Sequence, residues 1–308
     1  MLLPAPLRPG DRVALVAPCS PVRPERLAYA AEFIAGLGYT PEIYPSCHAR
    51  DGFLAGDDAL RADDLNRAFA DASVRAVVVA RGGYGGARLT DRLDYEAIRR
   101  NPKIFTGFSD ATVLHWLIGS RCGLVTFHAP MPAAANFPDD AYTRRALADV
   151  LAGRWRIAPD NAGAPLGCLC PGSAEGRLVG GNLTVLASTA GTPYRFGCQD
   201  CVLFLEDVGE YAYAIDRSLR QLLDSGMLQG CRGVLLGTWK DCAAPSDMPL
   251  REVFRRAFAP LGIPVISGLL CGHSVPSMAL PLGLRVRMES SAAGCRVEGS
   301  DLTETREE

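Results

Sequence analysis

The chain has 308 residues, of which 48% are hydrophobic and 21% charged. This length and composition fit a globular protein of about two domains and exclude both a disulfide-stapled mini-protein and a disordered chain. Its 32 basic and 34 acidic residues give a formal net charge of -2. That balance gives no reason to expect a nucleic acid or an anionic membrane as partner, so we expect chemistry on a small molecule or a peptide.

The 11 cysteines are an odd number scattered over a long chain, a pattern typical of reduced thiols rather than of a secreted disulfide framework. The N-terminal segment Met1–Asp11 is broken by three prolines and lacks both the positive segment and the continuous apolar run of a signal peptide. No stretch approaches the roughly 20 apolar residues that cross a bilayer. We therefore expect a soluble, cytoplasmic protein.

The first half of the chain alternates short β-branched runs with amphipathic stretches, which predicts an α/β domain with a parallel sheet and flanking helices. We assign residues 1–150 to this domain. Its predicted strands span residues 13–17, 41–44, 74–80, 104–108 and 124–127, and its predicted helices residues 24–37, 59–70, 87–93, 111–118 and 144–151.

Residues 151–176 are rich in Gly, Pro and Ala and are predicted to be a linker, followed by a second domain over residues 177–308. The last predicted strands follow one another with no helix between them, which indicates an α+β, barrel-like domain. Its predicted strands span residues 202–205, 233–238, 265–269, 280–288 and 295–298, and its predicted helices residues 183–190, 212–223 and 251–258.

Functional groups of open α/β sheets gather at the carboxyl ends of the strands. The strand at residues 74–80 runs into Arg81-Gly82-Gly83-Tyr84-Gly85-Gly86, which we call the glycine-rich loop. Its glycines let the backbone approach a ligand and present amide groups to it. The loop matches neither the dinucleotide fingerprint nor the P-loop, so a nucleotide cofactor is not expected.

A second strand end, Gly107-Phe108-Ser109-Asp110-Ala111, has the layout of a nucleophile elbow without its final glycine. Ser109 would be exposed above the sheet, and the Asp110 amide at the helix start would stabilise an oxyanion. The alternative is that Ser109 only caps the helix.

A serine nucleophile needs a base, and the chain has four histidines: His48, His115, His128 and His273. His273 lies in a tight loop after a buried strand, where a side chain can be held firmly, and His128, which closes an apolar strand, is the second choice. His115 falls inside an apolar helix and His48 in a polar loop, so a core or solvated role suits them better.

The base in turn needs a carboxylate that fixes its tautomer. Glu206 follows four apolar residues at the end of a predicted strand and suits this role, with Asp207 and Glu210 as competitors. A metal site is not favoured, because the close cysteine pairs, Cys168 with Cys170 and Cys198 with Cys201, lack further ligands at the right spacing.

Taken together, these segments resemble the LD-carboxypeptidases, also called muramoyltetrapeptide carboxypeptidases, over nearly the whole chain. The resemblance implies a catalytic triad of Ser109 as nucleophile, Glu206 as orienter and His273 as general base, with no metal or cofactor, in a cytoplasmic homodimer. We add the hypothesis that the amides of Gly83 and Asp110 bind the oxyanion. The segments that carry the resemblance are residues 10–18 (GDRVALVAP), 81–85 (RGGYG), 107–110 (GFSD), 180–183 (GGNL), 203–207 (LFLED), 215–217 (IDR) and 272–273 (GH).

The resemblance further implies hydrolysis of the amide between an L-centre and a C-terminal D-amino acid, D-alanine of a murein peptide, during peptidoglycan recycling. Two alternatives remain open. One is an enzyme similar to the microcin C self-immunity peptidases, acting on peptidyl or aminoacyl nucleotides, although the three scattered tryptophans suggest no aromatic insertion for a base. The other is a non-catalytic module that binds a peptide or phosphate through the glycine-rich loop.

Overall fold

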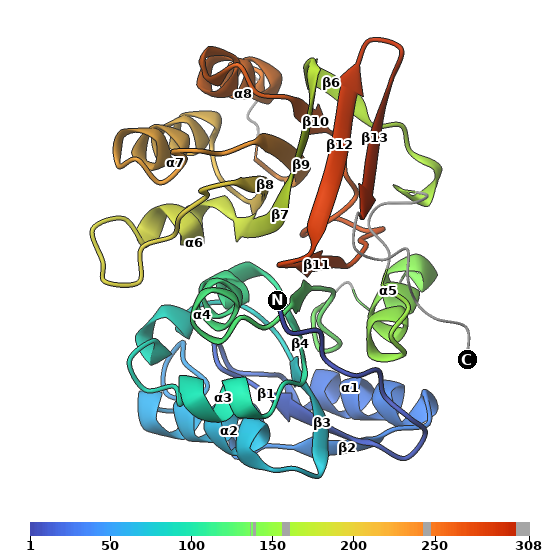
Figure 1. Cartoon of the computed structure of the whole chain (residues 1–308). Helices are drawn as coiled ribbons and strands as arrows, with labels where there is room; N and C mark the ends of the chain where they lie inside the picture. The colour runs from blue at the N-terminus through green and yellow to red at the C-terminus, as the bar shows by residue number, and fades with distance from the viewer. Residues whose placement is uncertain (136, 138–139, 156–160, 243–247, 300–308) are drawn as a thin grey trace. The chain divides into compact units, whose positions relative to one another are not determined.

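The computed structural model describes residues 1–135, 137, 140–155, 161–242 and 248–299 (Figure 1). The chain divides into two compact units, Met1–Trp155 and Arg156–Glu308. Within the described residues, no helix is both long and apolar enough to cross a membrane.

The first unit contains a parallel sheet whose strands lie in the order β2-β1-β3-β4-β5. The central strands β3 and β4 are buried along almost their whole length, as apolar strands covered on both faces must be. Helices α2, α3 and α4 pack against one another in sequence order. The elements are β1 Arg12–Val16, α1 Pro24–Gly36, β2 Thr40–Ile43, α2 Asp58–Ala70, β3 Val74–Val79, α3 Tyr95–Arg100, β4 Ile104–Gly107, α4 Thr112–Cys122, β5 Thr126–His128 and α5 Ala141–Leu151.

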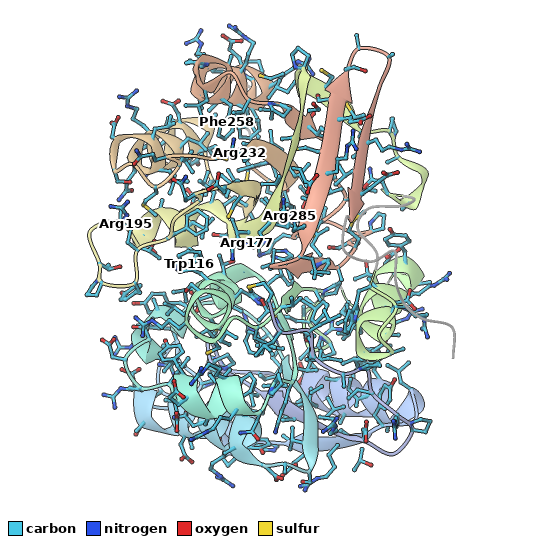
Figure 2. All side chains as sticks on the ribbon, in the orientation of Figure 1. Trp116, Arg177, Arg195, Arg232, Phe258 and Arg285 are labelled. Atoms are coloured by element: carbon cyan, nitrogen blue, oxygen red, sulfur yellow. The ribbon has the colours of Figure 1, made fainter. Side chains whose placement is uncertain are left out.

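The second unit contains a mixed sheet in the order β13-β12-β7-β8-β9-β10-β6, which curls into a nearly closed barrel (Figure 1). Helices α6, α7 and α8 lie side by side along it (Figure 1). Phe258, which is labelled in Figure 2, is the last residue of α8 and is completely buried. The elements are β6 Gly167–Cys170, β7 Gly172–Asn182, α6 Leu183–Ser188, β8 Cys201–Val208, α7 Ala212–Asp224, β9 Gly233–Lys240, α8 Leu250–Phe258, β10 Val265–Ser267, β11 Leu280–Leu282, β12 Arg285–Ser291 and β13 Gly294–Gly299.

The fold class predicted from the sequence, a parallel α/β domain followed by a barrel-like α+β domain, is confirmed. Some elements differ. Strand β6 and the first residues of β7 lie within residues 151–176, where composition predicts a linker. The single strand predicted at residues 280–288 is two strands, because Gly283 turns the chain with a φ of 102°.

Candidate active site

Ser109 lies where β4 passes into α4, and its φ of 63° places it in the left-handed region that residues with a side chain seldom adopt. A short 3₁₀ turn over Ser109–Ala111 precedes α4, and Ala111 is the N-cap residue of that helix, without a side-chain cap. Ser109 is therefore not the N-cap of α4. A strained backbone at the end of a buried strand is typical of residues held for function.

The turn is crowded, as the elbow pattern predicts. A Cβ atom on Gly107 would lie 2.9 Å from the Cβ of Val79 on β3 and 3.3 Å from the Cβ of Ala111. Larger side chains at positions 107 and 111 would push β4 and α4 apart. The small residues allow the tight approach that gives Ser109 its conformation.

The glycine-rich loop lies directly against Ser109. A Cβ atom on Gly82 would come within 2.9 Å of the Ser109 Cβ and 3.2 Å of its hydroxyl oxygen. Gly83 has a φ of 119° and no room for a side chain beside Ser20, whose hydroxyl accepts a hydrogen bond from the Tyr84 amide at 3.1 Å. The loop backbone can therefore approach a group bound at Ser109 closely.

The side chain of Asp110 is buried and ties the serine turn to the same loop. Its Oδ2 accepts a hydrogen bond from the Gly86 amide at 2.7 Å. Burial raises the pKa of Asp110, and the hydrogen bond from the Gly86 amide opposes the rise. The first unit thus brings together the predicted nucleophile, the glycine-rich loop and Asp110.

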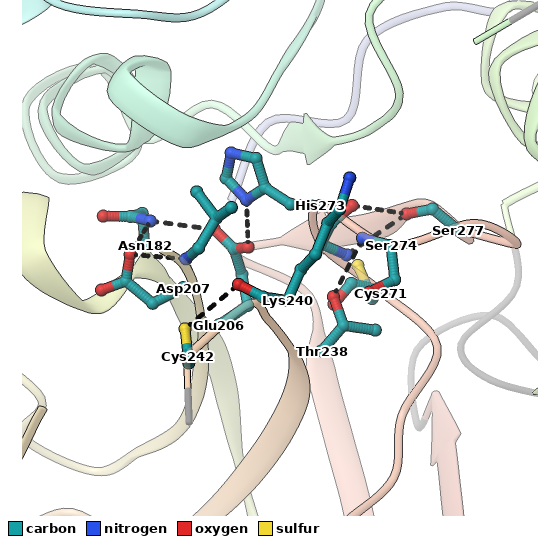
Figure 3. Close-up of polar contacts among 12 residues, drawn as sticks. Asn182, Glu206, Asp207, Thr238, Lys240, Cys242, Cys271, His273, Ser274 and Ser277 are labelled. Carbon is teal, nitrogen blue, oxygen red and sulfur yellow. Dashed lines mark hydrogen bonds and ion pairs between the residues drawn. The ribbon is translucent and has the colours of Figure 1, made fainter. Parts of the chain in front are cut away.

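The second unit brings together Glu206 and His273 (Figure 3). The Nδ1 atom of His273 lies 2.7 Å from Oε2 of Glu206, which is completely buried within β8, close to its end at Val208. A carboxylate only accepts hydrogen bonds, so Nδ1 donates and the neutral imidazole keeps its free electron pair on Nε2. Burial raises the pKa of Glu206, while the hydrogen bond from His273 opposes that rise.

Glu206 is oriented from the opposite side by Asn182 at the end of β7. The Asn182 amide nitrogen lies 3.3 Å from Oε1 of Glu206 and 2.8 Å from Oδ1 of Asp207. Asp207 also accepts hydrogen bonds from the amide and the hydroxyl of Thr184. Asp207 therefore holds Asn182 in place, and Glu206 is the carboxylate in contact with the imidazole. The sequence pattern alone had not assigned Asn182 a role, although it too ends a strand.

The loop that carries His273 is fixed by β9. Thr238 donates from its backbone amide to the Cys271 carbonyl at 2.9 Å, and its hydroxyl lies 3.4 Å from the Ser274 amide. Gly272 has a φ of 130°, and a Cβ there would meet Oε2 of Glu206 at 2.7 Å. Glycine at this position therefore lets the loop pass close to the carboxylate.

The other three histidines have different surroundings. His115 is a core residue, whose Nε2 bonds to the Gly107 carbonyl at 2.9 Å, and burial lowers its pKa to about 4. His128 is buried beside the ring of Phe108, and His48 is exposed. Among the described residues, no group of three or more His, Cys, Asp or Glu side chains gathers as a metal site.

Two family models match the chain: the LD-carboxypeptidase N-terminal domain over residues 13–129 and the LD-carboxypeptidase C-terminal domain over residues 175–288. A Streptomyces coelicolor relative, which carries the name of a carboxypeptidase without a stated substrate, is 42% identical over 94% of each chain. The chain belongs to the LD-carboxypeptidase family.

Two further members of this family have names that state a substrate. A Bacillus subtilis protein named "probable murein peptide carboxypeptidase" is 37% identical, over 96% of this chain and 94% of its own. The murein tetrapeptide carboxypeptidase of Pseudomonas aeruginosa is 31% identical, over 91% and 94%.

Solved structures agree with the family's fold. The muramoyltetrapeptide carboxypeptidase of Oxalobacter formigenes superposes with a TM-score of 0.79 at 28% identity, over 94% of this chain and 99% of that one. A Bacillus anthracis protein described as like MccF, the microcin C7 self immunity protein, superposes with a TM-score of 0.86 at 25% identity, over 97% and 99%.

Proposed function

We propose that this LD-carboxypeptidase family member is a serine peptidase in which Ser109, His273 and Glu206 form the catalytic triad. The observation that carries the proposal is the pairing of His273 with a completely buried carboxylate at 2.7 Å. Such a pair keeps the imidazole in the tautomer that can accept a proton at Nε2. The strained turn at Ser109, bordered by the glycine-rich loop, supports the same assignment.

In the proposed reaction, Nε2 of His273 takes the proton of the Ser109 hydroxyl as its oxygen attacks the substrate carbonyl carbon. The backbone amides of Gly83 and Asp110 stabilise the resulting oxyanion. The C–N bond then breaks, the leaving amine takes the proton from His273, and an acyl-serine ester remains. Water, deprotonated by His273, hydrolyses that ester and regenerates Ser109.

Glu206 stabilises the positive charge that His273 gains in each half of this reaction. Glu206 is completely buried, so the attraction between the two charges is screened less than it would be at the surface. The hydrogen bond from Asn182 keeps the carboxylate aimed at Nδ1. Glu206 thus acts by orienting the imidazole and stabilising the imidazolium, without taking part in proton transfer.

We propose that the substrate is a murein tetrapeptide and that the bond cleaved joins an L-centre to a C-terminal D-alanine. This reaction would release D-alanine in the cytoplasm during peptidoglycan recycling, catalysed by a homodimer without metal or cofactor. Support comes from the relatives at 37% and 31% identity, whose names state murein peptides as substrates.

The substrate is tested with a panel of peptides identical except for the configuration of the last two residues. Mass spectrometry of the products should show loss of one D-alanine from the peptide with an L,D-bond. The matched peptides with D,D- and L,L-bonds should remain intact. Cleavage of the D,D-peptide at an equal rate would contradict the proposed specificity.

A second candidate is cleavage of peptidyl or aminoacyl nucleotides, which the TM-score of 0.86 to the MccF-like protein favours. The rings of Tyr211 and Tyr213 stack with centroids 5.7 Å apart, and both side chains are exposed near the end of β8, where a base could stack. Turnover of an aminoacyl-sulfamoyl nucleotide, compared with that of the L,D-peptide, separates the two candidates.

The alternative of a non-catalytic binding module is tested with a fluorophosphonate, which reacts with activated serines. Labelling at Ser109 that is lost in His273→Ala supports the peptidase. Saturable peptide binding, with neither labelling nor turnover, supports the module.

A further inference from the structure

Arg61 on α2 is a buried charge that the proposed reaction does not use. Its side chain is completely buried, although arginine is among the residues most costly to remove from water. Buried charges require partners, and the partners of Arg61 show what it holds in place.

The guanidinium group binds three loops at once. Nε donates to the Gly56 carbonyl at 3.2 Å, and Nη1 donates to the carbonyls of Pro18 at 2.5 Å and Gly85 at 3.0 Å. Nη2 pairs with Asp58 at 2.5 Å. Arg61 therefore connects α2 to the loop after β1 and to the glycine-rich loop.

The contact with Gly85 fixes one peptide group from both sides. Its carbonyl oxygen accepts from Arg61, and its N–H group, which belongs to Gly86, donates to Asp110 at 2.7 Å. A peptide group is planar, so two opposed hydrogen bonds prevent its rotation. Gly85 has a φ of 126°, and a Cβ there would meet Nη1 of Arg61 at 2.6 Å, so glycine is needed for this contact.

The second loop held by Arg61 also contacts the glycine-rich loop. Two residues after Pro18, the Ser20 amide donates to the Gly82 carbonyl at 3.3 Å, and the Ser20 hydroxyl accepts from the Tyr84 amide. Arg61 thus supports the glycine-rich loop directly at Gly85 and through Ser20 at Gly82. Gly82 is the residue that packs against Ser109.

We infer that Arg61 is a positioning residue, which holds the glycine-rich loop in the orientation that presents the Gly83 amide to the oxyanion formed at Ser109. The inference rests on the function proposed above. A lysine cannot replace Arg61 fully, because the planar guanidinium reaches several carbonyls in fixed directions and an ammonium group does not.

The test compares Arg61→Met and Arg61→Lys with Arg67→Met. Arg67 lies on the same helix but is 61% exposed, in a surface ion pair with Asp63. We expect kcat for the L,D-peptide, per folded active site, to fall at least about 10-fold in Arg61→Met and less in Arg61→Lys, because misaligned oxyanion donors weaken transition-state binding. KM should stay within about threefold of wild type, because the ground state does not use these donors.

Hydrogen exchange supplies a second readout that does not depend on activity. Amides of residues 82–86 should exchange faster in folded Arg61→Met than in wild type, and Arg67→Met should leave them unchanged. If Arg61→Met does not fold, Arg61→Lys supplies both measurements. An unchanged exchange rate in this segment, or a kcat within twofold of wild type, would overturn the inference.

These outcomes are distinct from failure of the proposed function. If wild-type protein cleaves none of the peptides, the proposed function fails, and the exchange measurement still decides whether Arg61 holds the loop. If wild-type protein cleaves the L,D-peptide and Arg61→Met does so equally well, only the role of Arg61 is refuted.

Discussion

At the scale of single residues, the proposed chemistry depends on one carboxylate that is held out of contact with solvent. Glu206 is completely buried and has two partners, His273 and Asn182, one on each carboxylate oxygen. Its proposed role depends on both its negative charge and its shape. The neutral amide of a glutamine has nearly the same shape and places an oxygen at the same position, but it carries no charge. Substitution can separate these two contributions.

Glu206→Gln is expected to lower kcat by about 10²- to 10⁴-fold, because the amide neither stabilises the imidazolium nor enforces the donating state of Nδ1. Folding should be retained, since the side chains have nearly equal volume. The matched control is Glu210→Gln, four residues along, which should retain wild-type kcat. Steady-state kinetics on the L,D-peptide measures both, and equal kcat values for the two variants would remove Glu206 from the mechanism.

His115 should make stability depend on pH. Burial lowers its pKa to about 4, whereas an unfolded histidine has a pKa near 6.5. As the pH falls, the unfolded state therefore protonates His115 before the folded state does. The stability that the neutral, buried His115 contributes is complete above pH 6.5 and is lost progressively as the pH falls towards 4. The expected loss is about 3 kcal/mol.

Denaturant unfolding of wild type and His115→Gln at pH 7, 5.5 and 4.5 measures this effect. Glutamine can still donate to the Gly107 carbonyl but does not titrate. The wild-type protein should lose more stability than the variant as the pH falls. A difference between the two proteins that stays constant with pH would show that His115 does not titrate as its burial requires.

At the scale of elements, the serine turn depends on the distance between β4, β3 and α4. The elbow pattern predicts small residues at positions 107 and 111. The reason is that a Cβ atom on Gly107 would lie only 2.9 Å from the Cβ of Val79 and 3.3 Å from the Cβ of Ala111. The neighbours at Gly107 are side chains of the packed core, which cannot move aside freely. Gly119 within α4 offers a contrast, because a Cβ atom there would have its nearest neighbour, the Leu124 carbonyl oxygen, at 3.8 Å.

Gly107→Ala should destabilise the protein by about 1–3 kcal/mol through overpacking. Gly119→Ala should be neutral or stabilising by up to about 1 kcal/mol, because alanine favours the helix and has room there. Denaturant unfolding curves give both values. The explanation by crowding is contradicted if Gly107→Ala is as stable as wild type.

Elements with strong local patterns could be predicted from the sequence, and those defined by distant partners could not. The apolar run at β3 identifies its strand without knowledge of its neighbours. By contrast, β6 pairs with β10, about 100 residues later, and its Gly- and Cys-containing sequence carries little strand signal. The sequence pattern favours a helix over residues 87–93. In the structure, helix α3 begins only at Tyr95, after Asp94, whose side chain caps it.

At the scale of the whole molecule, each of the two units supplies a cluster of candidate residues of its own. The rule that functional groups gather at strand ends identifies Ser109 and the glycine-rich loop, which follow β4 and β3, and Glu206, which lies in the last residues of β8. The same rule offers no reason to select Arg61, which lies on α2, and it selects Asn182 only once the end of β7 is known, a strand that the sequence pattern does not predict. Their importance comes from contacts with residues 24 positions away, at Gly85 and at Glu206 respectively.

The role of Ser109 as nucleophile is the claim on which the mechanism depends, and removal of a single oxygen atom tests it most directly. The measurement is the kcat/KM for D-alanine release from the L,D-tetrapeptide by wild type and by Ser109→Ala, with the folded state of both verified by their unfolding curves. The account predicts a loss of at least about 10³-fold, because the remaining groups can bind the peptide but cannot form the acyl-enzyme. Turnover by folded Ser109→Ala close to that of wild type would contradict it.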